Sequence, residues 1–292
     1  MLSGFTSAAA ILIVSSQLPG ALGSAAPEGG VLARATWSLM HPASWEATAV
    51  GLTTVTVALV FGARSLNRRI PAVLLAAVVG FVFSIAAGYT GSTVGDIPVG
   101  MPAFTLELPW SRLPALLVPG AVIALVGFAE VASISRIFAS EDRERWDPDR
   151  EFLSQGAANL AAGLAGGFPV GGSFSRSTLN RLSNATSRWS GLVTGLGVLA
   201  FLPFAGVLAP LPTAVLAGIV IAAVSTLFRP RELFDIWRAS PPQAFVGWGT
   251  FAFTLLLAPN IEQAVLIGVI MATAVHMWRE LRPGLAARRE GD

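Results

Sequence analysis

A glycine- and serine-rich run that ends in an arginine is the part of this sequence best suited to bind a ligand. It extends from Gly166 to Arg176 and reads Gly-Gly-Phe-Pro-Val-Gly-Gly-Ser-Phe-Ser-Arg. Glycine and proline interrupt helices, and the serines that follow are suited to begin a new one. A helix N-terminus carries free N–H groups and a partial positive charge, and a nearby guanidinium adds to its attraction for an anion. The residues predicted to bind this anion are Gly172, Ser173, Phe174, Ser175 and Arg176.

Two of these residues also have a simpler interpretation. Ser173 is a favourable N-cap, and in that role it would satisfy N–H groups at the helix start without binding a ligand. Phe174 could shape the pocket or pack against a neighbouring helix. Both interpretations stay open at the level of sequence.

Glu130 is an ionisable residue in an otherwise apolar run, from Ala121 to Ser135. A carboxylate in the hydrocarbon region of a membrane is costly and indicates function by default. We predict that Glu130, with Ser133, has a role in cation coupling, by taking a proton or by helping to bind Na⁺. A structural ion pair or a hydrogen bond between helices is the alternative.

Other polar residues lie between these two candidates. Asp149 and Glu151 suit the first turn of a helix and are interpreted as capping residues, not as catalytic groups. Gln155 and Asn159 are four residues apart on one helix face, where they would bond to another helix or line a cavity.

The composition indicates a membrane protein. Of its 292 residues, 53% are hydrophobic and 12% are charged, against about 25% charged in a typical soluble domain. The absence of cysteine excludes disulfides and thiolate metal sites, and the two histidines do not suggest a metal site. No nucleophile–base set, nucleotide-binding loop or nucleic-acid motif is present, so we expect neither an enzyme nor a nucleic-acid-binding protein.

Ten apolar segments follow one another along the chain, most of them near the ~20 residues that span a bilayer. They are Leu2–Leu22, Trp45–Ala63, Pro71–Gly88, Leu113–Ala139, Phe152–Gly166, Ser173–Leu182, Trp189–Val207, Thr213–Phe228, Gln243–Ala258 and Ile261–Trp278. The fifth and sixth are short, and their glycine-rich junction predicts a broken helix at membrane depth. Such backbone is tolerated only where it is buried in protein or lines a wet cavity.

The distribution of arginine predicts the orientation in the membrane. All 19 basic residues are arginines, and most of them gather near the ends of the even-numbered segments, whereas the other connections hold Arg34 and Arg112 and little else that is basic. By the positive-inside rule these ends lie in the cytoplasm, together with the C-terminus. The first segment lacks the basic start of a signal peptide and is interpreted as a membrane helix.

Several motifs in consecutive order resemble the SulP (sulfate permease) family of anion transporters. They are Phe128-Ala-Glu-Val-Ala-Ser-Ile-Ser, Asp147-Pro, Gln155-Gly-Ala-Ala-Asn-Leu, and the run from Gly166 to Asn180. The resemblance implies an all-α polytopic protein with a fold of two inverted repeats of seven segments, divided into a core and a gate. It also implies Glu130 on segment eight, a substrate site at the start of segment ten, H⁺ or Na⁺ as coupling ion, no other cofactor, and a homodimer.

The resemblance also sets the expected domains. Residues 1–112 and 208–280 correspond to two parts of the gate, residues 113–207 to half of the core, and residues 281–292 to a cytoplasmic tail. Segments one to four and the C-terminal STAS domain of the family have no counterpart here, so a separate chain that supplies the N-terminal helices is an expected partner.

The predicted function is secondary active transport of small inorganic anions, of the sulfate or bicarbonate class, across the cell membrane. Two alternatives remain. The chain could be a truncated fragment without transport activity, or one half of a split transporter. The substrate could instead be a nucleobase, as in uracil and xanthine permeases.

Overall fold

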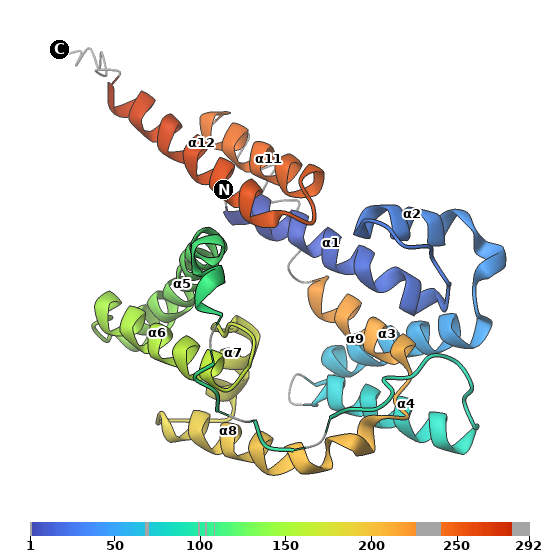
Figure 1. Ribbon diagram of the computed structural model, residues 1–292. Helices are drawn as coiled ribbons and strands as arrows, with labels where there is room; N and C mark the ends of the chain where they lie inside the picture. The colour runs from blue at the N-terminus through green and yellow to red at the C-terminus, as the bar shows by residue number, and fades with distance from the viewer. Residues whose placement is uncertain are drawn as a thin grey trace, which may run out of the picture. The chain divides into compact units, whose positions relative to one another are not determined.

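The computed structural model describes residues 2–67, 70–98, 100–102, 104–107, 109–225 and 241–281. The chain divides into two compact units, both helical (Figure 1). The first unit combines Met1–Thr93 with Leu211–Asp292, and the second is Val94–Pro210. The unit boundaries therefore differ from residues 113 and 207, where the core was expected to begin and end. The roles of core and gate stay predictions.

The described helices of the first unit come from both ends of the chain. They are α1 (Leu2–Leu22), α2 (Val31–Met40), η1 (Pro42–Ser44), α3 (Ala47–Leu66), α4 (Ala72–Ala86), α9 (Thr213–Val224), α11 (Pro241–Leu256) and α12 (Ile261–Leu281). Those of the second unit are η2 (Trp110–Arg112), α5 (Leu113–Asp142), α6 (Pro148–Leu164), α7 (Phe174–Leu182), α8 (Trp189–Phe201) and η3 (Leu202–Leu208).

Each of the ten expected segments overlaps an α-helix of the structure, and α1 agrees with its prediction at both ends. Residues 226–228, the expected end of the eighth segment, lie outside the described part of the chain. Helix α2 was not predicted from the sequence. Its Ser38 is fully buried and accepts a hydrogen bond from the Ser24 hydroxyl at 2.7 Å, just beyond the end of α1. Contact with α1 therefore stabilises a segment that is too short and too polar to be recognised as a membrane helix.

Glycines allow helices of the first unit to approach closely. A Cβ atom added to Gly4 of α1 would lie only 2.0 Å from the carbonyl oxygen of Gly247 in α11. A Cβ atom at Gly80 of α4 would lie 2.5 Å from the Cγ2 atom of Val215 in α9. Side chains larger than hydrogen do not fit at either crossing. Small residues at helix crossings are typical of helices that pack closely in a membrane.

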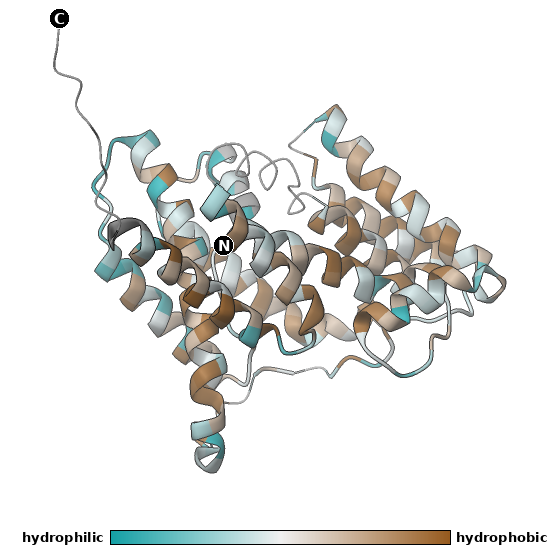
Figure 2. Ribbon diagram, turned by 90° about the horizontal axis from the view of Figure 1, so that it is seen from above, coloured by the Kyte–Doolittle hydropathy of each residue, from teal (hydrophilic) through white to brown (hydrophobic). Residues whose placement is uncertain are grey.

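Five helices within the described residues are long and apolar enough to cross a membrane. They are Ser3–Leu22, Ala47–Leu66, Trp110–Asp142, Trp189–Leu208 and Ile261–Trp278. The described helices are largely hydrophobic, and hydrophilic residues lie mainly near helix ends and in connections (Figure 2). A helix that is apolar on several faces is suited to lipid or to further protein, not to water.

Two side-chain contacts tie α5 to its neighbours in the second unit. The rings of Phe128 in α5 and Phe152 in α6 meet edge to face, with 5.0 Å between their centroids. At the C-terminal end of α5, Arg181 of α7 donates two hydrogen bonds to the carboxylate of Asp142, at 2.6 and 2.8 Å. Helices α6 and α7 are thus both anchored to the long helix α5.

Candidate functional site

Helix α6 is capped at both ends; Asp149 and Glu151, predicted for its first turn, lie there, but the residue that caps its start is Asp147. The Asp147 carboxylate accepts hydrogen bonds from the N–H groups of Asp149 and Arg150 at 3.1 and 3.2 Å. At the other end, Gly166 takes the left-handed conformation, with φ +67°. The N–H of Gly166 donates to Gly163 O at 3.0 Å and that of Gly167 to Ala162 O at 2.8 Å. These two bonds form a Schellman motif, which turns the chain out of the helix.

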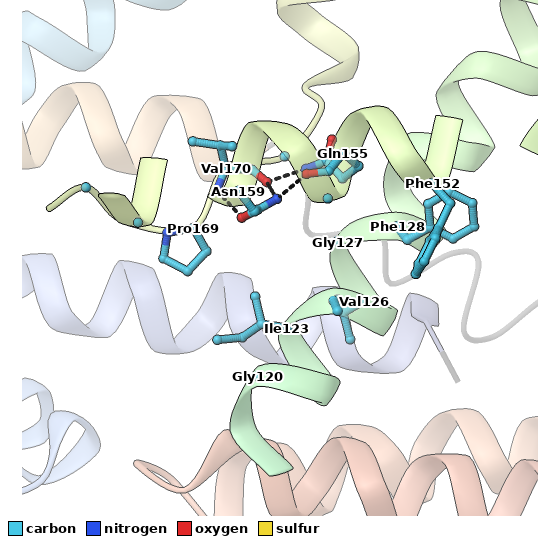
Figure 3. Close-up of a pocket in the computed structure, with 15 residues that line it drawn as sticks. Gly120, Ile123, Val126, Gly127, Phe128, Phe152, Gln155, Asn159, Pro169 and Val170 are labelled. Atoms are coloured by element: carbon cyan, nitrogen blue, oxygen red, sulfur yellow. Dashed lines mark hydrogen bonds between the residues drawn. The ribbon is translucent and has the colours of Figure 1, made fainter. Parts of the chain in front are cut away.

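The connection after this cap is held against the side of α6. The Asn159 side chain donates from Nδ2 to Val170 O at 3.0 Å and accepts at Oδ1 from Val170 N–H, also at 3.0 Å (Figure 3). The Gln155 side chain donates to the same carbonyl oxygen. Both polar groups of the Val170 backbone are therefore satisfied by α6 side chains. The sequence predicted that Gln155 and Asn159 bond to another helix or line a cavity. They line a cavity, and the segment they bond to is the connection after α6, not another helix.

The chain next crosses to α5 at Gly172. A Cβ atom added there would lie 3.1 Å from Val131 Cγ2 and 3.6 Å from Ile134 Cδ1, both buried side chains of α5. The backbone of Gly172 thus packs directly against α5 at Val131, the residue that follows Glu130. A larger residue at this position would push the connection away from α5.

Helix α7 begins at Phe174, so the predicted break between the fifth and sixth segments is confirmed. Ser173 occupies the position just before it, and its carbonyl oxygen accepts the N–H of Ser177 at 2.9 Å. The Arg176 side chain, in the first turn, is exposed. The side chains of Phe174 and Ser175 lie outside the described part of the chain, so the structure leaves their predicted contacts open.

Glu130 and Ser133, the predicted cation-coupling residues, lie three positions apart on α5, and both side chains are exposed. Their spacing places them on one side of the helix. Within the described residues, no group of three or more His, Cys, Asp or Glu side chains could hold a metal ion. The coupling role of these two residues stays a prediction.

A cavity of about 540 Å³ lies between α5, α6 and the connection that precedes α7 (Figure 3). Its polar lining includes Gln155 and Asn159, and glycines occur on all three of its sides. These glycines are Gly120, Gly127, Gly156, Gly163, Gly167 and Gly171. The described lining ends at Gly171, the residue before the predicted anion-binding run from Gly172 to Arg176.

Two features of this region were not predicted from the sequence. One is the pair of hydrogen bonds from the Asn159 side chain to the backbone of Val170, and the other is the ion pair of Arg181 with Asp142. The spacing of Gln155 and Asn159 indicated that they act together, but a sequence does not show which backbone segment folds against them.

The sequence profile of the sulfate permease family matches residues 1–250. The chain is 32% identical over 302 residues to a probable sulfate transporter 4.2 of Arabidopsis thaliana, covering 98% of this chain and 44% of that protein. It is 29% identical to the bicarbonate transporter BicA of Synechocystis, covering 96% of this chain and 50% of that protein. The chain therefore spans about half the length of the curated relatives it matches.

Two solved structures are similar in fold. The murine Solute Carrier 26 family member A9 anion transporter, in its inward-facing state, superposes with a TM-score of 0.83 at 20% identity, over 95% of this chain and 47% of that one. The transmembrane domain of the cyanobacterial bicarbonate transporter BicA gives a TM-score of 0.75 at 26% identity, over 90% of this chain and 67% of that one.

Proposed function

This chain belongs to the sulfate permease family, and from this we propose that it takes part in secondary active transport of small inorganic anions, of the sulfate or bicarbonate class. It is an all-α, multi-pass membrane protein with the inverted-repeat fold of its solved relatives. The relatives named as sulfate and bicarbonate transporters support the substrate class, because both anions are small, oxygen-rich and negatively charged.

The observation that carries the proposal is the start of α7. The helix begins at Phe174 after a non-helical connection, and Arg176 lies in its first turn. By helix geometry the first N–H groups of α7 have no partners within the helix, and they add to a partial positive charge at that end. We propose that Gly172, Ser173, Phe174, Ser175 and Arg176 bind the anion there.

Glu130 is the proposed coupling residue, with Ser133 beside it. Gly172 of the proposed anion site packs against Val131 of α5. Glu130 is the residue before Val131, so the two proposed sites are close along α5. A proton or Na⁺ held at Glu130 would reduce the repulsion between its negative charge and an arriving anion. Binding of the cation and of the anion would then favour each other.

The same proposal includes the cellular context predicted from the sequence. Residues 113–207 would move as part of the core against a gate built from residues 1–112 and 208–280. The protein would lie in the cell membrane with its C-terminus in the cytoplasm, and it would act as a homodimer or with a second chain.

Uptake of labelled anion into proteoliposomes tests the proposal. Purified protein should accumulate labelled sulfate or bicarbonate when an inward H⁺ or Na⁺ gradient is imposed. Arg176→Ala should weaken uptake by about tenfold or more, the usual effect of losing a charge-assisted hydrogen bond. Glu130→Gln should abolish the response to the cation gradient.

Arg188→Ala is the matched control, because Arg188 is an exposed arginine of the same unit that lies outside α7. Its uptake should equal that of the unchanged protein. Absence of gradient-driven uptake in the unchanged protein would contradict the carrier role. Competition by uracil but not by sulfate or bicarbonate would contradict the substrate class.

A further inference from the structure

Three hydrogen bonds with α6 side chains hold the backbone N–H and the carbonyl oxygen of Val170. Asn159 bonds both to the N–H and to the carbonyl oxygen of Val170, each at 3.0 Å. Gln155 donates to the same carbonyl oxygen. The Asn159 Nδ2 atom also lies 2.9 Å from Gln155 O in its own helix, which fixes the carboxamide against α6.

A carboxamide is well suited to this pair of contacts. It offers a donor and an acceptor side by side, with the spacing of a backbone peptide group. A carboxylate would accept the Val170 N–H but would face the Val170 carbonyl oxygen with a second acceptor. An aliphatic side chain of similar size would leave both groups of Val170 without these partners. The role therefore requires the chemistry of Asn159 and not merely its volume.

The contact fixes where α7 begins. Asn159 lies in the middle of α6, so Val170 is drawn back along the helix after the turn at Gly166. Two residues later the chain rests on Val131 of α5 at Gly172, and α7 starts at Phe174. Three residues separate Val170 from Phe174, which leaves little freedom for the position of the first turn of α7 once Val170 is held.

We propose that Asn159, assisted by Gln155, is a positioning residue that sets the affinity of the anion site without touching the anion. It does so by holding Val170, and through Val170 the N–H groups at the start of α7. The inference rests on the proposed anion site at that helix start. Releasing Val170 would let these N–H groups spread over many positions, so an anion would have to order them on binding and would bind more weakly.

The test measures anion binding and the position of the connection separately. Titration of the purified protein with inorganic sulfate, and separately with bicarbonate, gives the Kd. Since the sequence has no cysteine, Gly171→Cys provides a single labelling site where a Cβ atom meets no neighbour within 4 Å. The rate of maleimide labelling at this site reports how the connection is held.

Asn159→Leu should raise the Kd by about tenfold, as expected for the loss of one to two hydrogen bonds, and should also change the labelling rate. Gln155→Leu, which removes one bond, should act in the same direction but less. Asn159→Gln retains the carboxamide and should recover part of the affinity, which a role in volume alone would not explain. If Asn159→Leu does not fold, the Kd and the labelling rate of Gln155→Leu test the inference instead.

Asn180→Leu is the matched control. It removes the hydrogen bond that the Asn180 side chain accepts from the Ser190 hydroxyl at 2.5 Å, in the same unit but away from Val170. Its Kd should stay within about twofold of the unchanged protein, well below the effect of a lost contact in the site. Failure of the unchanged protein to bind either anion would overturn the proposed function. Normal binding by the unchanged protein with an unaltered Kd in Asn159→Leu would overturn the positioning role alone.

Discussion

At the scale of single residues, Gly172 links the two predicted sites because its backbone touches α5 beside Glu130. A Cβ atom at this position would lie 3.1 Å from Val131 Cγ2, closer than ordinary van der Waals contact. Val131 is buried and β-branched, so it cannot easily turn away. The hydrogen atom of glycine is thus what permits the start of α7 to lie against α5.

Gly172→Val should weaken sulfate binding, because the added methyl groups push the connection off α5. The variant Gly172→Val/Val131→Ala removes the opposing side chain and should restore much of the affinity, which titration of the purified protein measures. Gly195→Ala in α8 is the control, since its Cβ atom meets nothing within 4 Å. Equal sulfate affinity in Gly172→Val and the unchanged protein would show that the close approach has no part in binding.

At the scale of elements, α6 is defined by its two caps. Asp147 satisfies N–H groups at its start, and the left-handed Gly166 satisfies carbonyl groups at its end. A side chain at Gly166 would be strained by its positive φ, whereas nothing within 4 Å opposes a Cβ atom there. Any loss of stability on substitution would therefore come from backbone conformation and not from packing.

Gly166→Ala should lower the free energy of unfolding by about 1 kcal/mol, the usual cost of a left-handed conformation in a residue with a Cβ atom. Thermal melting in detergent micelles, followed by circular dichroism, measures the change. Gly163→Ala is the matched variant, because Gly163 lies within the last turn of α6 and its Cβ atom meets nothing. It should be neutral or slightly stabilising. Equal melting temperatures for the two variants would argue against the capping role of Gly166.

At the scale of the whole molecule, the first unit is assembled from segments at opposite ends of the sequence. Helix α1 packs on α9 and α11, which follow it by about 200 residues or more. The close crossing at Gly4 and Gly247 is part of this assembly, because their backbones touch. Thr53 of α3 also links α1 to α9, since its hydroxyl lies 2.9 Å from Ala21 O of α1 and 3.0 Å from Ala214 O of α9.

Gly4→Ala should destabilise the first unit by about 1–3 kcal/mol, the typical cost of overpacking, because the atom it meets is backbone and cannot rotate away. Gly51→Ala, within α3, meets nothing within 4 Å and should be neutral or stabilising. Melting temperatures in detergent compare the two. A Gly4→Ala protein as stable as Gly51→Ala would mean that α1 and α11 do not cross as closely as the structure has them.

Much of this fold was predictable because its elements are set by local chemistry. Apolar length predicts helices in a membrane, so α1 agreed with its expected bounds and the other nine segments each overlapped a helix. The run from Gly166 to Ser173 predicted the break before α7, because glycine, proline and serine act on the backbone nearest to them. The motifs around Glu130 and Arg176 also carried the family resemblance, which the family profile confirmed.

The sequence by itself determined the membrane class, the helices, the helix break and the family, all of which depend on neighbouring residues or on recognisable motifs. Only the tertiary structure decided that Asn159 holds Val170, that Gly172 rests on Val131, and that α2 forms against the end of α1. Each of these depends on which distant segments meet. A hydrogen bond or a close contact between residues far apart in the sequence cannot be read from the sequence, because it forms only when the fold brings the two partners together.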